Sequence, residues 1–372
     1  MAEPTAMRAA FACTDEDYDR LGLNRDKVEA WEDGLRTDGS SGDYEWWYFD
    51  SHLEGGANLV LAIHSKEDMK AELPEFEPFA TFEFNTADGR SYTERVDFTA
   101  QEFFTSTERC DIRVENSEGK CAFVGDLHEY HITFENENAK ADVRLKGTVP
   151  SWRTQSGIIE YADGSQKFGW IVAIPNGDVV ADIEVDGQHY HLTGTGYHDH
   201  NWGNVSMLAV HHDWYWGRCQ VGGYNIISAY ITEDRAFGYA ELPEFMLVDP
   251  AGRLYDDPNK VTYEVSDPVV DEDTGQTIHN RVFYGYEDAS SGTRFEITYL
   301  RDKTIVARKL VDQLPEEMRP AIIATGFDGA YIRFSGKVEL KRFENDSLVE
   351  EKVADAVWER MYFGDMPTPP QA

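Results

Sequence analysis

Pairs of turn-forming residues recur along the first half of the chain, and each pair separates two short runs typical of β-strands. These pairs are Asp88-Gly89, Glu118-Gly119, Asp163-Gly164, Asn176-Gly177 and Asp186-Gly187. Their spacing is typical of antiparallel hairpins, because such turns match the twist of the strands on either side. The pattern predicts an all-β chain with few helices.

The remaining pattern predicts two antiparallel β domains. Strands are expected at 44–52, 58–64, 79–84, 224–232, 236–242, 261–265, 282–286, 294–300 and 330–342, with a last strand that carries Trp358 to Gly364. Short helices are expected within 16–31 and 315–324. Many short strands favour barrels or sandwiches, and a length of 372 residues favours two of them. We expect an N-terminal extension (1–35), a first domain (36–203), a second domain (204–366) and a loose tail (367–372).

The charge of the chain limits its partners. A formal net charge of −35 repels phosphate backbones and anionic membrane surfaces, so nucleic acid is not expected as a partner. The first sixteen residues contain no apolar run that a signal peptide would need, and no segment reaches the length of a membrane span. We expect a cytoplasmic protein without an integral membrane segment. The oligomeric state is left open.

Four widely spaced cysteines are expected to be free thiols, because no C-x-x-C spacing is present. Cys110 and Cys121 could pair if they lay on adjacent strands, and the sequence leaves that alternative open.

The residues that could carry chemistry are concentrated in two neighbouring motifs, Tyr-His-Asp-His-Asn-Trp-Gly from Tyr197 and His-His-Asp-Trp-Tyr-Trp-Gly from His211. Proton-transfer groups beside aromatic faces suit acid-base chemistry on an apolar substrate. His198 and His200 would lie on the same side of a strand and could share a metal, but the spacing matches no helix-borne zinc motif, and no metal is predicted. For His189, His191 and His211, a packing role is preferred.

A second concentration, from Gly42 to His52, contains the run Glu45-Trp46-Trp47-Tyr48. On a strand, Glu45, Trp47 and Phe49 share one face, and the alternate residues share the other. One tryptophan and Phe49 are expected to pack in a core. A carboxylate such as Glu45 among aromatics is costly unless it is paired or protonated.

Several enzyme classes lack their motifs here. The chain has no Gly-x-Ser-x-Gly nucleophile elbow, no dinucleotide-binding Gly-x-Gly-x-x-Gly and no phosphate-binding loop.

Three motifs resemble those of the carotenoid 1,2-hydratase (hydroxyneurosporene synthase) family, whose superfamily includes AttH-like proteins, kievitone hydratase and fungal Diels-Alderases. They are Asp43 to Asp50, Phe168-Gly169-Trp170 with Pro175, and Gly194 to Gly203. The resemblance implies two lipocalin-like β-barrel domains packed side by side, no organic cofactor and a hydrophobic small-molecule substrate. It assigns alkene protonation to the His and Trp of a His-Asn-Trp triplet, here His200 and Trp202, and to a Tyr-x-Asp motif. Tyr230 matches that tyrosine, but Thr232 stands in place of the aspartate, which counts against carotenoid hydration itself.

The resulting hypothesis is a cofactor-independent lyase or isomerase, most simply a hydratase that adds water across, or protonates, a C=C bond of a large isoprenoid- or polyphenol-like molecule. Asp199 or Glu45 would hold the proton, His200 with Tyr230 would move it to or from water, and Trp202, Trp214 or Trp216 would stabilise the cation. The predicted substrate-binding residues are Trp46, Trp47, Tyr48, His64, Tyr197, His198, Asn201, His212, Trp214 and Trp216.

Two alternatives remain at this point. A cyclase or isomerase of the Diels-Alderase kind would fold a polyene or polyketide and hydrogen-bond a carbonyl, and its product would gain no solvent deuterium on carbon. A lipocalin-type carrier would hold a hydrophobic ligand unchanged, but it has no evident use for a cluster of titratable groups.

Overall fold

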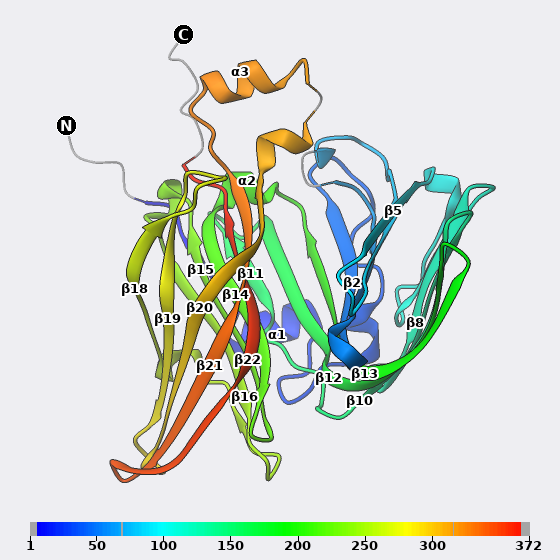
Figure 1. Ribbon diagram of the computed structural model, residues 1–372. Coiled ribbons are helices and arrows are strands. Elements are labelled where there is room, and N and C mark those ends of the chain that lie inside the picture. The colour runs from blue at the N-terminus through cyan, green and yellow to red at the C-terminus, as the bar shows by residue number, and fades with distance from the viewer. Residues whose placement is uncertain (1–5, 68–69, 315, 366–372) are drawn as a thin grey trace. The chain divides into compact units, whose positions relative to one another are not determined.

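The computed structural model describes residues 6–67, 70–314 and 316–365, and the chain forms two compact units (Figure 1). The N-terminal unit comprises Ala10–Met207. The C-terminal unit comprises the described residues from Leu208 onward together with those up to Ala9. The N-terminal unit includes residues 10–35, which are most of the N-terminal extension expected from the sequence. The predicted tail (367–372) lies outside the described residues.

The N-terminal unit is built on a curled antiparallel sheet of 13 strands, ordered β5-β4-β3-β2-β13-β12-β10-β9-β8-β7-β6. Off this path, β11 pairs with β12, and β1 pairs with β11. The strands are β1 (Ala9–Phe11), β2 (Tyr44–Leu53), β3 (Asn58–His64), β4 (Phe79–Asn85), β5 (Ser91–Asp97), β6 (Phe103–Phe104), β7 (Asp111–Glu115), β8 (Gly119–Gly125), β9 (Glu129–Asn136), β10 (Ala139–Gly147), β11 (Ile158–Tyr161), β12 (Gln166–Val185) and β13 (Gln188–Gly203). The short helical elements are α1 (Asp15–Leu21), η1 (Ala30–Asp33), η2 (Glu54–Gly56) and η4 (Ala100–Glu102).

The C-terminal unit is built on a curled antiparallel sheet of nine strands, ordered β17-β16-β15-β14-β22-β21-β20-β19-β18. The strands are β14 (His211–Val221), β15 (Tyr224–Glu233), β16 (Glu241–Val248), β17 (Leu254–Tyr255), β18 (Val261–Val270), β19 (Thr277–Asp288), β20 (Thr293–Lys309), β21 (Ala330–Glu344) and β22 (Ser347–Tyr362). The helical elements are α2 (Met207–Val210), η5 (Arg235–Phe237), η6 (Pro258–Lys260), η7 (Leu310–Gln313) and α3 (Arg319–Ala324).

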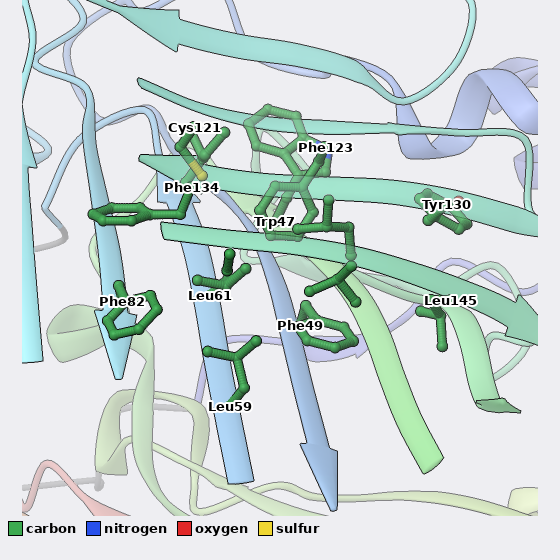
Figure 2. Close-up of a cluster of buried hydrophobic side chains, with 14 of the residues drawn as sticks. Trp47, Phe49, Leu59, Leu61, Phe82, Cys121, Phe123, Tyr130, Phe134 and Leu145 are labelled. Carbon is green, nitrogen blue, oxygen red and sulfur yellow. The ribbon is translucent and has the colours of Figure 1, made fainter. Parts of the chain in front are cut away.

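Each sheet curls around its own hydrophobic core. In the N-terminal unit, side chains from β2, β3 and β4 meet side chains from β8, β9 and β10 across the interior (Figure 2). Phe82 on β4 and Phe134 on β9, for example, have ring centroids 5.3 Å apart. In the C-terminal unit, Tyr230 on β15 stacks on Tyr263 on β18 at 3.9 Å. The predicted fold class, antiparallel lipocalin-like β domains with few short helices, is confirmed.

Three local predictions were wrong. Asn176-Gly177 is not a hairpin turn, because β12 continues through it with a register shift between Ile174 and Gly177. A side chain at Gly177 would meet the backbone oxygen of Lys146 at 2.6 Å, so the glycine permits close strand pairing there. The strand expected at 236–242 begins only at Glu241, after η5. The helix expected within 16–31 is two short elements, α1 and η1.

Other local predictions were confirmed. Strand β3 has the predicted bounds, and α3 lies within the predicted range 315–324, of which residue 315 is outside the described part. All four cysteines are free. Cys110 and Cys121 therefore do not pair, although Cys121 lies on β8 beside β7, the strand that follows Cys110. Among the described residues, no helix has the length and apolar character needed to cross a membrane.

Candidate active site

Except for His64 on β3, the predicted site residues of the N-terminal unit lie on two neighbouring strands, β2 and β13, and divide between the two faces of the sheet. Trp202 pairs with Glu45 and His200 pairs with Trp47, whereas Asp199 pairs with Tyr48. Paired residues of antiparallel strands share a face. We call Glu45, Trp47, His198, His200 and Trp202 the inner set, because Trp47 belongs to the hydrophobic core. We call Trp46, Tyr48, Tyr197, Asp199 and Asn201 the outer set.

His200 is the centre of the inner set, and it is completely buried. Its Nε2 lies 2.8 Å from Oε1 of Glu45, and its Nδ1 lies 3.2 Å from the backbone oxygen of Glu32. The imidazole stacks on Trp47 at 4.6 Å, and Trp202 lies beside it at 4.9 Å. His200 thus has a partner at both nitrogens and aromatic rings against it.

Glu45 is the paired carboxylate that its aromatic surroundings require. It is fully buried and accepts hydrogen bonds from the backbone N–H groups of Arg36 (2.7 Å) and Thr37 (3.0 Å) and from the Thr37 hydroxyl (2.6 Å). With His200, these donors occupy both carboxylate oxygens. The pair Glu45–His200 therefore joins β2, β13 and the segment that follows η1.

Sequence reasoning missed the acidic residues of η1, Glu32 and Asp33, which enter the same interior. Asp33 Oδ2 lies 3.2 Å from His198 Nε2 and accepts a hydrogen bond from the Tyr130 hydroxyl. Glu32 accepts from the buried guanidinium of Arg153 at 2.8 Å. No motif marks these residues, because their partners lie roughly 100 or more positions away along the chain. Buried charges need such partners, and only the fold brings them together.

Asp33, Cys110 and His198 offer ligand atoms within 4.8 Å of one another, so this cluster could hold a metal by geometry. Burial lowers the pKa of His198, but the charge of Asp33 and hydrogen bonds to Asp33 and Tyr48 outweigh burial and raise it. Burial raises the pKa of Asp33, but His198 outweighs it and lowers that pKa. Asp33 and His198 therefore compensate each other as an ion pair, and we propose no metal there.

Asp199 is the titratable group of the outer set. Its Oδ2 accepts hydrogen bonds from the Tyr197 hydroxyl (2.7 Å) and the Trp170 indole (2.9 Å), and its Oδ1 accepts from the Asn201 amide (3.1 Å). Burial raises the pKa of Asp199 to about 7, although the bonds from Tyr197 and Trp170 oppose that shift, and the charge of Asp50 adds to it. Asp199 is only 7% exposed. Asp199 therefore holds its proton to a much higher pH than an ordinary aspartate does.

His64 extends the outer face onto β3, opposite Trp46. It lies between two rings, stacked on Phe79 at 4.4 Å and on Trp46 at 6.1 Å. Burial, with a contribution from the charge of Arg95, lowers its pKa to about 3. His64 is therefore a neutral aromatic surface at physiological pH.

The other predicted residues belong to the C-terminal unit. Tyr230 is half-buried against the core of that unit and stacks on Tyr263. His212 bonds Asp213 at 2.6 Å, and this bond raises its pKa. Trp214 and Trp216 are half-buried on β14, and Thr232 pairs with Asp213 and Glu241.

Two curled antiparallel sheets with a buried acid on a strand face define a lipocalin-like two-unit protein. The family model described as Diels-Alderase-like matches residues 23–273, and the chain belongs to this family. The resemblance inferred from the β2 and β13 motifs is confirmed.

Curated relatives are similar over part of their length. A hydroxyneurosporene dehydrogenase of Chlorobaculum tepidum is 26% identical over 209 residues, which cover 48% of this chain and 53% of the relative. The quinolone epoxide rearrangement protein penF of Penicillium thymicola is 31% identical over 122 residues, which cover 29% and 32%. The chain thus spans about half or less of the length of these relatives. The name of the second relative, a rearrangement protein, agrees with the predicted isomerase class.

Solved structures share the fold over most of their length. A CghA structure with Sch210972 has a TM-score of 0.61 at 13% identity and covers 92% of this chain and 97% of that one. Kievitone hydratase of Nectria haematococca has a TM-score of 0.55 at 11% identity, with coverages of 91% and 94%. A putative AttH of Nitrosomonas europaea has a TM-score of 0.55 at 17% identity, with coverages of 89% and 95%.

Proposed function

We propose that this protein is a lyase or isomerase that needs no organic cofactor, most simply a hydratase acting on a C=C bond of a large isoprenoid- or polyphenol-like molecule. The observation that carries the proposal is the outer-set carboxyl group of Asp199, which is buried among aromatic side chains and has a pKa raised to about 7 by that burial. A relative named as an epoxide rearrangement protein and a structural neighbour named as a hydratase support the same class.

Asp199 has the properties of a general acid. Protonating an alkene requires a carboxyl group that keeps its proton at neutral pH, and burial supplies that condition. Three donors from Trp170, Tyr197 and Asn201 hold the group in one orientation. They also stabilise the carboxylate that remains once the proton has moved to carbon.

The neighbouring groups complete the chemistry. Tyr48 lies opposite Asp199, and Trp46 and Trp170 share its face, so a cation formed on the substrate would meet aromatic rings. Water then bonds to the cationic carbon and loses a proton to Asp50, a buried carboxyl group paired with Tyr197 across the strands. Transfer of that proton to Asp199 restores the enzyme, and the net change is the addition of one water molecule.

We propose a positioning role for Glu45 and His200 in place of direct contact with substrate. Both side chains have no exposed surface, and their polar atoms already have partners. They fasten β2 to β13 from the inner face, directly behind the strand segment that carries Asp199. This assignment differs from the sequence-based hypothesis, in which His200 moves the proton.

The test compares the wild type with Asp199→Asn on lipophilic alkenes, for example squalene and kievitone, in deuterium oxide. The wild type should form a hydrated product with deuterium on carbon. The amide that replaces the carboxyl group in Asp199→Asn cannot protonate carbon, so we expect turnover to fall by roughly 10²- to 10⁴-fold. Wild-type turnover in a folded Asp199→Asn variant would refute the role of Asp199.

Cyclisation is a second candidate, favoured by the match to the Diels-Alderase-like family. A protonated Asp199, aligned with Tyr197, could hydrogen-bond a substrate carbonyl and lower the barrier to ring closure without protonating carbon. Product formed in deuterium oxide without deuterium on carbon would favour cyclisation over hydration.

A further inference from the structure

A second buried acid, Glu244, lies on β16 of the C-terminal unit and has no role in the chemistry described above. Strand register places it in one row with Trp216 on β14 and Ala229 on β15, three strands that are neighbours in the sheet (Figure 1). Residues in such a row share a face. The small side chain of Ala229 therefore stands between a large indole and a carboxyl group.

The surroundings of Glu244 are apolar. The residues of the adjoining row on this face are Trp214, Ile231 and Leu242. On the other side of Glu244 lie Ile227 and Met246, each 1% exposed. Charged groups on the same face include Glu233, which bonds His211 at 2.9 Å, Arg218, and Glu359, which accepts from the Tyr331 hydroxyl and pairs with Arg333 across the strands.

Glu244 has no partner of its own within the described part of the chain. It is only 2% exposed, yet no hydrogen bond or ion pair between described residues involves its carboxyl group. Burial, together with the charge of Glu233, raises the pKa of Glu244 well above its ordinary value. Both effects favour the protonated form, in which the carboxyl group can donate a hydrogen bond.

A buried polar group without a partner lowers stability, and leucine at this position would fit the apolar row better. Glu32 is a useful contrast, because it is equally buried but bonded to Arg153. Groups that reduce stability in this way are concentrated at sites that bind ligands.

We propose that Glu244 is a ligand-binding residue, whose carboxyl group donates a hydrogen bond to a carbonyl or hydroxyl oxygen of an apolar molecule lying against Trp216 and Ala229. That the molecule is apolar rests on the proposed function. What Glu244 adds is that the molecule carries an oxygen atom able to accept a hydrogen bond. The substrate class narrows to lipophilic molecules that already carry an oxygen.

The experiment compares two probes, all-trans-retinal and the oxygen-free hydrocarbon anhydroretinol, by quenching of tryptophan fluorescence in the full chain. We expect Glu244→Leu to weaken retinal binding about 3- to 10-fold, the contribution of one hydrogen bond, and to leave anhydroretinol binding unchanged. Glu244→Gln keeps an N–H donor and should retain most of the retinal affinity. Thermal melting should show Glu244→Leu at least as stable as the wild type, whereas the control Glu32→Leu should melt lower.

Three results would overturn the proposal. The first is that the wild type does not bind retinal, or binds it no more strongly than anhydroretinol. The second is that the wild type and Glu244→Leu bind retinal equally well. The third is that Glu244→Leu unfolds or melts at a lower temperature than the wild type. The experiment requires no turnover, so its failure would leave the role of Asp199 untouched. Loss of activity in Asp199→Asn would likewise not bear on Glu244.

Discussion

Substitution of His200 by alanine separates a structural role from a chemical one. The change removes the group that lies 2.8 Å from Glu45 and 3.2 Å from the Glu32 carbonyl, and it removes the ring stacked on Trp47. A buried carboxylate that loses a partner costs roughly 1.5–3 kcal/mol. The cavity left by the ring adds roughly 2 kcal/mol. The sum is about 4 kcal/mol of unfolding free energy.

In a unit spanning Ala10–Met207, a loss of 1 kcal/mol lowers the melting temperature by roughly 2–4 °C, so His200→Ala should melt roughly 8–16 °C below the wild type. Calorimetry of the full chain measures this shift. His191→Ala is the matched control, because His191 lies on the same strand with 68% of its side chain exposed, and its loss should not change the melting temperature. A His200→Ala variant with wild-type melting but no turnover would refute the positioning role and restore the sequence-based hypothesis.

Other consequences follow from the same contacts. The pKa of Asp199 is about 7 in the folded chain and 3.8 ordinarily, so its ionisation should remove about 4 kcal/mol of unfolding free energy as pH rises from 4 to 8. Urea unfolding of Asp199→Asn should lack that loss. Parallel pH dependence of the unfolding free energy in the wild type and Asp199→Asn would contradict this prediction. In Gly169→Ala, the new methyl group would lie 2.2 Å from the Trp202 ring, so we expect the unfolding free energy to fall by roughly 1–3 kcal/mol and the tryptophan fluorescence to change. An unchanged fluorescence spectrum would show that this contact does not fix the position of Trp202. Lys66→Met should lower the melting temperature, because it removes a buried ammonium group that donates hydrogen bonds to the backbone carbonyl oxygens of Gly39, Ser40, Ala71 and Leu73. An unchanged melting temperature would show that these bonds do not contribute to stability.

Local pattern predicted the elements that local chemistry determines. Alternation along β2 placed Glu45 and Trp47 on one face and Trp46 and Tyr48 on the other, which the register confirms. The cost of burying Glu45 predicted that its carboxyl group would be either paired or protonated, without identifying His200 as the partner. Asn176-Gly177 was wrong because the same dipeptide that forms a hairpin turn also permits a bulge within a long strand.

Long-range contacts could not be predicted in this way. Asp33 meets His198 from 165 positions away, and Arg153 meets Glu32 from 121 positions away, so no spacing marks either pair. The same limit applies to Asp199. Its place in the His-Asp-His-Asn-Trp motif predicted an acid, but the donor from Trp170 comes from another strand.

The most direct test of the central claim is a titration of the Asp199 side chain. Carbon-13 labelling of aspartate carboxyl groups, with Asp199→Asn to assign the signal, would follow its protonation by NMR in the full chain. A midpoint at about pH 7 is the predicted result, with the proton held at neutral pH for transfer to substrate. A midpoint close to the ordinary value of 3.8 would contradict the proposal, because Asp199 would then have no proton to donate.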